Sequence, residues 1–431
     1  MPITSAAILA IGDELVLGQT VDTNTAWIAQ RLAARGIMAN LHLTVPDDHH
    51  AIRDAFLQAA DTAPWVIVTG GLGPTADDLT RFALAEAMGV DLVEDADALS
   101  TLKTWFEGRG KPMPQRNRVQ AMIPRTASAL PNPVGTAPGI HAKLNNAQVF
   151  VMPGVPRELF AIYQERVEPT IVAASGGNIL MTRKINTFGV GESAIGETLS
   201  DLMTRDANPT IGTTVSGGVV SVRIRASGTR HDDVVCLLST AQKQVETRLC
   251  ALVYGLDDTL LQDATIALLR EKNMTVATAE SCTGGMISAS LTDVAGSSAV
   301  FLGGFVTYAN DRKINDLAID EDTLSNHGAV SAAVARAMAQ GARQRTGADI
   351  AIATTGIAGP EGGTPDKPVG TVWFGLATPS ESCAYHAKLR GDRAMIRNRS
   401  KMIALQLIRF ATMGEDPAQM DWLTADSAVV K

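Results

Sequence analysis

The sequence predicts an α/β protein with a doubly wound parallel sheet in its N-terminal domain and a second α/β domain in its C-terminal third. Apolar strands and amphipathic helices alternate near the N-terminus, and three apolar strands of the C-terminal third each run into a polar or glycine-rich turn. Such alternation is typical of parallel sheets covered by helices. The length of 431 residues predicts two to three domains, including a small α+β unit between the two sheets.

Composition limits the classes of function. The formal net charge of −8 argues against a nucleic-acid-binding face. The four cysteines show no C-x-x-C spacing, as expected for reduced thiols in the cytoplasm. Asp13 and Glu14 interrupt the first apolar run, so no signal peptide is expected, and no apolar run is long enough to span a bilayer. We therefore expect a cytoplasmic protein that binds neither nucleic acid nor membrane.

The N-terminal region has a β-α-β-α-β order. Strands are expected at three apolar runs and helices at the two amphipathic segments between them: residues 6–11, 22–35, 41–45, 51–60 and 65–69. This order predicts a doubly wound sheet, and ligands of such sheets bind at the carboxyl ends of the strands.

A glycine-rich segment, Thr69–Thr80, follows the third of these strands. Its glycines let a phosphate approach the backbone, and the adjacent acids Asp77 and Asp78 stand at the start of the next helix. Phosphate-binding backbone beside carboxylates predicts a nucleotide site with a metal ion, although Asp78 would equally serve as a helix cap. The residues of this candidate site are Gly70, Gly71, Gly73, Thr75, Asp77 and Asp78.

A further strand, residues 148–152, leads into a turn at Pro153–Leu159. Glu158 lies near the start of the helix that follows. Two interpretations of this residue stay open: a favourable position against the helix dipole, or a carboxylate close to a metal ion.

Four of these runs together resemble the molybdopterin-binding-like domain of the CinA (competence/damage-inducible) family. They are Gly12–Leu15, Asp22–Asn24, Thr69–Thr80 and Pro153–Leu159. The resemblance implies a domain at residues 1–172 that cleaves the pyrophosphate of ADP-ribose. It also implies a divalent cation, with a monovalent cation as an optional second ion. The implied metal ligands are Asp77 and Asp78, with Glu14 and Glu158 as further candidates.

The sequence of residues 173–256 predicts a small α+β domain, and it contains no recognisable set of catalytic residues. Strands and helices are expected at residues 182–188, 191–202, 219–225 and from 231 onward. The segment 208–212 is interpreted as a turn, and the domain as a spacer or a dimer contact.

The C-terminal region contains the turn Ala279–Gly285, which follows an apolar strand and precedes a helix. Ser281, Cys282 and Thr283 place two hydroxyls and a thiol there, and the paired glycines let backbone amides converge where the helix begins. Such a turn favours an anion or a developing oxyanion, and it suits a serine nucleophile. An ordinary helix cap with a glycine turn is the other interpretation of the same residues.

Two more strands of this region also end in polar or glycine-rich turns, one within the run 301–313 and one at residues 349–355. In a mostly parallel sheet the three turns would meet at one edge and bind a small phosphorylated ligand. A helix is expected at residues 331–346 and paired strands at 369–377 and 383–389.

Three arginines stand near the start of the last predicted helix, which ends at about Met413. Arg393 follows a loop and is the candidate phosphate ligand. Arg397 and Arg399 are expected to face solvent.

Residues 257–413 resemble the C-terminal domain of the CinA family, whose activity is deamidation of nicotinamide mononucleotide. The matching runs are Ala279–Gly285, Gly304–Lys313, His327–Ser331, Gly356–Pro360, Lys367–Val372 and Gly391–Arg393. The resemblance implies Ser281 as the nucleophile, Lys313 as its base and Tyr308 as a group that orients the lysine or relays a proton. The remaining binding residues are Cys282, Thr283, Gly284, Gly285, Asn310, Thr355, Gly356, Gly359 and Arg393, with the amides of Thr283 and Gly284 around the oxyanion. No histidine or cysteine spacing suggests zinc, so we expect the deamidase to need no cofactor.

Alternatives remain at this point. Cys282 competes with Ser281, because a thiolate at a helix start would be activated. A different class of function is a non-catalytic nucleotide- or molybdopterin-binding regulatory protein linked to competence or DNA damage. The resemblance implies a homodimer, and residues 414–431, with little apolar periodicity, are expected to form a mobile tail.

Overall fold

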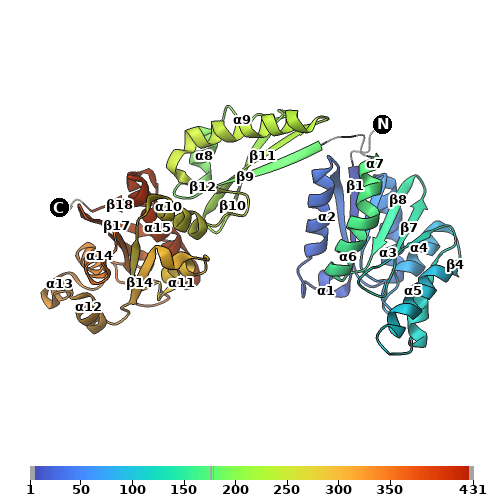
Figure 1. Cartoon of the computed structure of the whole chain (residues 1–431), viewed down its shortest axis with the longest axis horizontal. Coiled ribbons are helices and arrows are strands. Elements are labelled where there is room, and N and C mark those ends of the chain that lie inside the picture. Colours follow the sequence, from blue (N-terminus) through green and yellow to red (C-terminus); the bar gives the residue numbers. More distant parts are fainter. Residues whose placement is uncertain (1–4, 175–176, 178, 427–431) are drawn as a thin grey trace. The chain divides into compact units, whose positions relative to one another are not determined.

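The computed structural model describes residues 5–174, 177 and 179–426 (Figure 1). The chain divides into two compact units, Met1–Met181 with Ala226–Cys236, and Thr182–Arg225 with Leu237–Lys431. No helix in the described residues has the length and apolarity needed to cross a membrane.

The sheet of the N-terminal domain has six strands in the order β2-β1-β3-β8-β7-β6. The first four run parallel, and β7 and β6 extend the sheet with antiparallel pairing. The strands are β1 (Ser5–Ile11), β2 (Met38–Val45), β3 (Trp65–Thr69), β6 (Ser128–Leu130), β7 (Gly139–Leu144) and β8 (Ala147–Met152). The predicted doubly wound sheet is confirmed.

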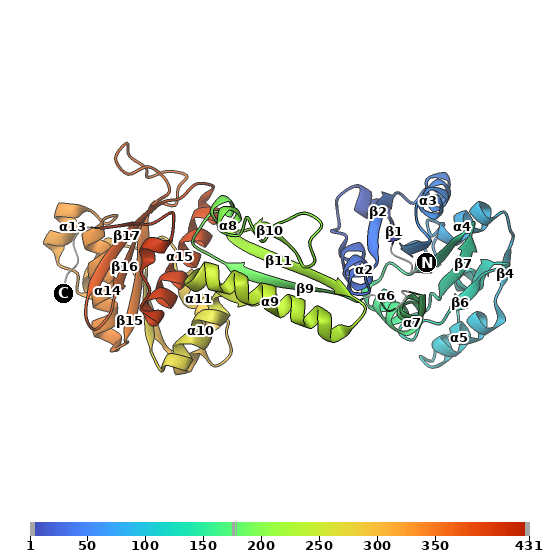
Figure 2. The same ribbon diagram turned by 90° about the horizontal axis from the view of Figure 1, so that it is seen from above.

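Helices cover both faces of this sheet (Figure 2). Because side chains alternate along a strand, β1 contributes Ala6 and Ile8 to one core and Ala7 and Leu9 to the other. The first core is closed by α2, α6 and α7, and the second by α3 and α4. The helices are α1 (Asp13–Val16), α2 (Thr23–Ala34), α3 (His49–Thr62), α4 (Thr80–Met88), α5 (Ala96–Glu107), α6 (Pro156–Ile162) and α7 (Glu168–Ala174). Two short strands, β4 (Leu92–Glu94) and β5 (Met122–Pro124), pair separately.

The middle domain is a four-stranded sheet, β10-β11-β9-β12, with two helices. Its elements are β9 (Ile179–Thr187), α8 (Glu192–Thr198), β10 (Thr210–Ser216), β11 (Val219–Gly228), α9 (His231–Leu249) and β12 (Val253–Leu256). The turn predicted at residues 208–212 is wrong in part, because β10 begins at Thr210 and pairs along its whole length with β11. An Asn-Pro pair with a nearby glycine favours a turn locally, whereas the neighbouring strand decides the conformation.

The sheet of the C-terminal domain has the order β14-β13-β15-β16-β17-β18. Its strands are β13 (Val276–Glu280), β14 (Phe301–Val306), β15 (Ile350–Gly356), β16 (Thr371–Ala377), β17 (Ser382–Lys388) and β18 (Thr424–Ala425). The three adjacent strands β14, β13 and β15 are parallel, so the turns that follow them lie at one edge. The strand pair predicted at residues 369–377 and 383–389 is confirmed as β16 and β17, which run antiparallel.

The helices of this domain also form two layers. They are α10 (Leu261–Lys272), α11 (Met286–Thr292), α12 (Asn310–Leu317), α13 (Glu321–His327), α14 (Ala332–Thr346) and α15 (Arg393–Met413). One core joins α10, α11 and α15 to the sheet, and the other joins α12, α13 and α14 to the opposite face. α15 is the longest of these helices and begins beside the edge where the three turns meet.

The segment after α15 is folded as far as residue 426, so the expected mobile tail is wrong there; residues 427–431 lie outside the described residues. Met420 is 1% exposed and packs in the same core as Phe188 of the middle domain. The backbone N–H of Asp421 donates to the carbonyl of Gly189 at 2.9 Å, and β18 pairs with β17. This segment therefore ties the middle domain to the C-terminal domain.

Met420→Ala should lower the free energy of unfolding by about 2–5 kcal/mol, the usual cost of truncating a buried methionine. The measurement is the shift of the urea unfolding midpoint. Met395→Ala, at a methionine that is 48% exposed, is the matched control and should leave the midpoint nearly unchanged. Equal midpoints for the two variants would show that the tail adds no stability.

Candidate functional site

The turn after β13 is held in place by a buried carboxylate, that of Glu280. Its side chain is fully buried and accepts hydrogen bonds from the backbone N–H groups of Gly285 (2.9 Å), Ile287 (3.1 Å) and Ser288 (2.8 Å), and from the Ser288 hydroxyl (2.7 Å). These are the amides that a helix start leaves without partners. Sequence analysis gave Glu280 no role, and nothing in its local pattern signals one.

Ser281 lies directly after this residue and is 8% exposed. Its backbone N–H donates to the Thr354 carbonyl of β15 at 2.9 Å. The hydroxyl is thereby presented at the edge where β13, β14 and β15 end, facing a cavity of about 280 Å³.

Lys313, in the first turn of α12, forms a hydrogen bond with that hydroxyl. Its Nζ lies 3.1 Å from Ser281 Oγ, 2.8 Å from the Thr307 carbonyl and 3.2 Å from the Tyr308 carbonyl. The residue is 1% exposed, and burial lowers its pKa. Among the described residues no carboxylate pairs with it, so its charge has no anionic partner to retain it.

The three hydrogen-bond partners of Lys313 determine which of them a neutral amine would donate to and which it would accept from. A neutral amine has two N–H groups and one lone pair, and a carbonyl oxygen can only accept. If the two N–H groups donate to the Thr307 and Tyr308 carbonyls, the lone pair is left for the Ser281 hydroxyl. This arrangement suits removal of the hydroxyl proton.

The Cys282 thiol is 5% exposed, and burial raises its pKa to about 11. A reactive cysteine has the opposite property, a pKa lowered by nearby positive charge or a helix start. The thiol is therefore poorly suited to act as the nucleophile near neutral pH.

The predicted oxyanion donors need one correction. The N–H of Gly284 donates to the Ser281 carbonyl at 3.1 Å, and that of Gly285 donates to Glu280. Both glycines have positive φ angles, 60° and 93°, and they shape the turn. Among the described residues, the N–H groups of Cys282 and Thr283 donate to no backbone carbonyl. The acceptor near both of them is the Cys282 sulfur, which accepts hydrogen bonds only weakly.

Tyr308 occupies a different place from the predicted one. Its side chain is 61% exposed, and its hydroxyl accepts a hydrogen bond from Arg393 at 3.2 Å, not from Lys313. Only its backbone carbonyl contacts the lysine. Arg393 also donates to the Gly359 carbonyl at 2.7 Å and lies at the rim of the cavity.

The cavity wall includes most of the other predicted binding residues: Cys282, Asn310, Thr355, Gly356, Gly359 and Arg393. Thr283, Gly284 and Gly285 lie outside its lining. Sequence analysis did not single out Ala329, Val330 or Glu361, which also line it. The Thr355 hydroxyl donates to the Ala329 carbonyl at 2.7 Å and so fixes that part of the wall.

Arg397 was expected to face solvent, and this is wrong. Its Nε donates to the Cys282 carbonyl at 3.1 Å and its Nη2 to the Thr283 carbonyl at 2.8 Å. The side chain thus holds the turn that carries Ser281 from the side of α15.

The N-terminal domain has a second cavity, of about 430 Å³, at the carboxyl ends of its parallel strands. Its wall is formed by the predicted glycines and acids together with residues from three other loops: Gly12, Glu14, Asp47, Gly70, Gly71, Gly73, Asp77, Asp78, Gly154 and Glu158. At Gly70, where φ is +109°, a side chain would collide with the Ile11 carbonyl. Glycine is required at this position because the backbone of Gly70 lies directly against that of Ile11.

Asp78 organises the glycine loop. Its carboxylate accepts hydrogen bonds from the backbone N–H groups of Gly73 (2.7 Å) and Thr75 (2.8 Å) and from the Thr75 hydroxyl. Arg81, 1% exposed, donates to the Leu72 and Gly73 carbonyls. Both oxygens of Asp78 are engaged, so its carboxylate shapes the loop.

Negative charge gathers on the other side of this cavity. Burial raises the pKa of Asp47, and the nearby Asp13, Glu14 and Asp77 raise it further. Burial also raises the pKa of Glu158, whose carboxylate accepts a hydrogen bond from Asn132 at 2.6 Å. In the part of the chain that the structure describes, the single cluster with three metal-ligating atoms within 4.8 Å is His49, His50 and Glu86. The acids of the cavity do not converge in that way.

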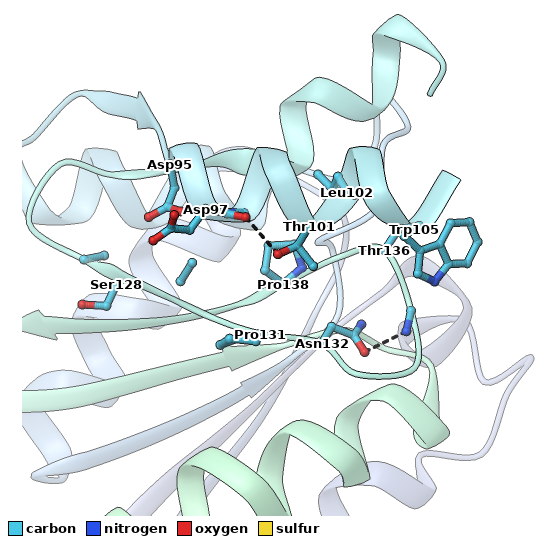
Figure 3. Close-up of a pocket in the computed structure, with 14 residues that line it drawn as sticks. Asp95, Asp97, Thr101, Leu102, Trp105, Ser128, Pro131, Asn132, Thr136 and Pro138 are labelled. Atoms are coloured by element: carbon cyan, nitrogen blue, oxygen red, sulfur yellow. Dashed lines mark hydrogen bonds between the residues drawn. The ribbon is translucent and has the colours of Figure 1, made fainter. Parts of the chain in front are cut away.

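A third cavity, of about 290 Å³, lies between α5 and the loop after β6 (Figure 3). Trp105 and Leu102 form part of its wall, and Asn132 accepts hydrogen bonds from the backbone of its own loop. Thr136 borders both this cavity and the glycine-loop cavity. Sequence analysis did not anticipate it.

Three family models match the chain. They are "Probable molybdopterin binding domain" over residues 7–173, "Damage-inducible protein CinA KH domain" over residues 182–255 and "CinA C-terminal domain" over residues 258–412. The KH match of the middle domain was not predicted from the sequence.

Curated relatives match over nearly the whole length. "Putative competence-damage inducible protein" of Symbiobacterium thermophilum is 41% identical over 421 residues, 95% of this chain and 99% of that protein. "CinA-like protein" of Geobacter metallireducens is 43% identical over 404 residues, 94% of this chain and 98% of that protein. Among solved structures, competence/damage inducible protein CihA from Agrobacterium tumefaciens is 41% identical over 36% of this chain and 93% of its own, with a TM-score of 0.35.

Proposed function

This chain belongs to the CinA family, and we propose that its C-terminal domain hydrolyses the carboxamide of nicotinamide mononucleotide to nicotinic acid mononucleotide and ammonia. The observation that carries the proposal is the 3.1 Å approach of Lys313 Nζ to Ser281 Oγ at a buried position. A buried amine without an anionic partner is costly, and such groups gather at catalytic sites.

Acylation begins when Lys313 takes the hydroxyl proton and Ser281 Oγ bonds to the carboxamide carbon. The carbonyl oxygen becomes negatively charged and accepts hydrogen bonds from the N–H groups of Cys282 and Thr283. The C–N bond then breaks, and the proton on Lys313 passes to the leaving nitrogen, which departs as ammonia.

Deacylation repeats the same steps with water. Lys313 takes a proton from a water molecule, the resulting hydroxide attacks the ester carbon, and the proton returns to Ser281 Oγ as the acid leaves. In this proposal Arg393, in the wall of the cavity, binds the phosphate of the substrate, and its hydrogen bond to the Tyr308 hydroxyl orients the guanidinium.

The test is ammonia release from purified protein with nicotinamide mononucleotide as substrate. Release of ammonia together with nicotinic acid mononucleotide supports the proposal. Tight binding of the nucleotide without turnover would favour the non-catalytic regulatory protein instead.

For the N-terminal domain we propose metal-dependent cleavage of the pyrophosphate in ADP-ribose. The observation that favours it is the pairing of phosphate-accessible glycine backbone with the acids Glu14, Asp47 and Asp77 around one cavity. Oxygen donors of this kind fit a divalent cation, and Mg²⁺ characteristically keeps several waters and substrate phosphates among its ligands. When bound, the cation would neutralise charge on the pyrophosphate.

Asp77→Ala should lower ADP-ribose cleavage by roughly 10- to 100-fold, as loss of a carboxylate near a metal typically does. Asp78→Ala should instead lower the unfolding midpoint of the protein, because three loop hydrogen bonds are lost. Asp91→Ala, at an exposed carboxylate outside the cavity, is the control. None of the three should affect ammonia release, and a wild-type protein without cleavage in Mg²⁺, Mn²⁺ or Co²⁺ would make the domain a binding module.

A further inference from the structure

Arg397 contacts the turn that carries Ser281 without contacting Ser281 itself. It projects from the second turn of α15 and is half-buried. Its two donors reach successive carbonyls, those of Cys282 and Thr283. A side chain added at Gly284 would lie 3.3 Å from its Nη2, so the guanidinium lies closely against the turn.

The geometry of the peptide bond converts these contacts into control of N–H directions. In a planar trans peptide, the C=O of one residue and the N–H of the next point in opposite directions. Holding the Cys282 carbonyl therefore aims the Thr283 N–H away from Arg397. Holding the Thr283 carbonyl fixes the Gly284 N–H, which donates to the Ser281 carbonyl. The Ser281 carbonyl in turn fixes the N–H of Cys282.

The Arg397 side chain thus fixes the orientation of three consecutive peptide groups, those that follow Ser281, Cys282 and Thr283. Two of these peptide groups carry the N–H groups of Cys282 and Thr283, which are the ones assigned above to the oxyanion. Charge acts in the same direction. A cation on the carbonyl side of a peptide polarises it and strengthens its N–H as a donor. Among the described residues Arg397 forms no ion pair with a carboxylate.

We propose that Arg397 is a positioning residue, which orients and polarises the amides of Cys282 and Thr283 toward the oxygen that becomes negatively charged during amide hydrolysis. The proposal rests on the proposed amidase activity of this site. It predicts an effect on the transition state that leaves binding of the substrate unchanged, because the amides meet full negative charge only as the tetrahedral intermediate forms.

The experiment compares Arg397→Met, Arg397→Lys and the control Arg399→Met. Arg397→Met keeps much of the stem and loses both donors, and kcat should fall by roughly 10²- to 10³-fold with KM unchanged, as for loss of an oxyanion donor. Arg397→Lys keeps the charge, but a single ammonium does not reproduce the fork, so its kcat should lie between those of wild type and Arg397→Met. Arg399→Met, two residues along the same helix, should retain the wild-type kcat.

Two further measurements separate positioning from simple structural support. The midpoint of the pH–rate profile should be the same in wild type and Arg397→Lys, because Lys313 is untouched. Affinity for nicotinamide mononucleotide, measured by calorimetry in a Ser281→Ala background, should be the same with and without Arg397→Met.

A wild-type kcat in Arg397→Met overturns the positioning role and leaves the amidase standing. A raised KM with unchanged kcat also overturns it, since Arg397 would then serve ground-state binding. If Arg397→Met does not fold, a wild-type kcat in Arg397→Lys has the same consequence. A wild-type protein that releases no ammonia removes the amidase and this inference together.

Discussion

Replacing Ser281 with alanine should lower the rate of ammonia release from nicotinamide mononucleotide by on the order of 10⁴- to 10⁶-fold, as removal of a nucleophile does. The reason is positional, because Ser281 Oγ is the hydroxyl that meets Lys313 Nζ at 3.1 Å. Intact mass spectrometry of a rapidly quenched reaction should detect an acyl adduct on the wild-type protein and none on the variant.

The matched control is Cys282→Ala, at the neighbouring residue of the same turn. Most of the activity should survive, because the buried thiol has a pKa raised to about 11 and little of it is ionised near neutral pH. Loss of activity in Cys282→Ala with retention in Ser281→Ala would transfer the nucleophile role to the thiol.

Lys313→Met should lower kcat by at least roughly 10²- to 10⁴-fold, the usual contribution of a general base. In the wild type, the rate should rise with pH through the pKa of Lys313, which burial places below its ordinary value of 10.5. Below that pKa the ammonium has no lone pair for the serine proton, and above it the amine has one.

Lys313→Arg tests the sign of this effect, because an arginine stays protonated over the whole accessible range. Its activity should be low and should not recover as pH rises. The control is Lys401→Met, at another lysine whose pKa burial lowers, and its pH profile should match that of wild type. A wild-type rate that falls as pH increases from 6 to 9 would contradict Lys313 as the base.

Much of the architecture was accessible from local pattern. β3 occupies residues 65–69 as predicted, and α14 begins after its cap Ser331, because apolar runs and capping residues act over a few positions. Local pattern could not predict that Ser281 lies near Lys313, because 32 residues and a whole strand separate them. That proximity was predicted from the family resemblance.

The features that were missed depend on distant parts of the chain. Arg397 meets its carbonyl partners 114 and 115 residues away, and an arginine on a helix shows no sign of such a contact in its own neighbourhood. The folded segment around Met420 finds its partners near Gly189, more than two hundred residues earlier. Gly284 was predicted as an oxyanion donor because the sequence shows which residues form a turn. It does not show which N–H groups are already hydrogen-bonded within that turn, as the Gly284 N–H is to the Ser281 carbonyl.

The buried carboxylate of Glu280 has a consequence for how ligands enter the C-terminal cavity. Because the carboxylate accepts hydrogen bonds from the amides at the start of α11, these amides are not available to bind a free phosphate. Under the proposed function, the phosphate of the substrate binds Arg393 at the rim of the cavity, and the carboxamide end of the substrate lies toward Ser281.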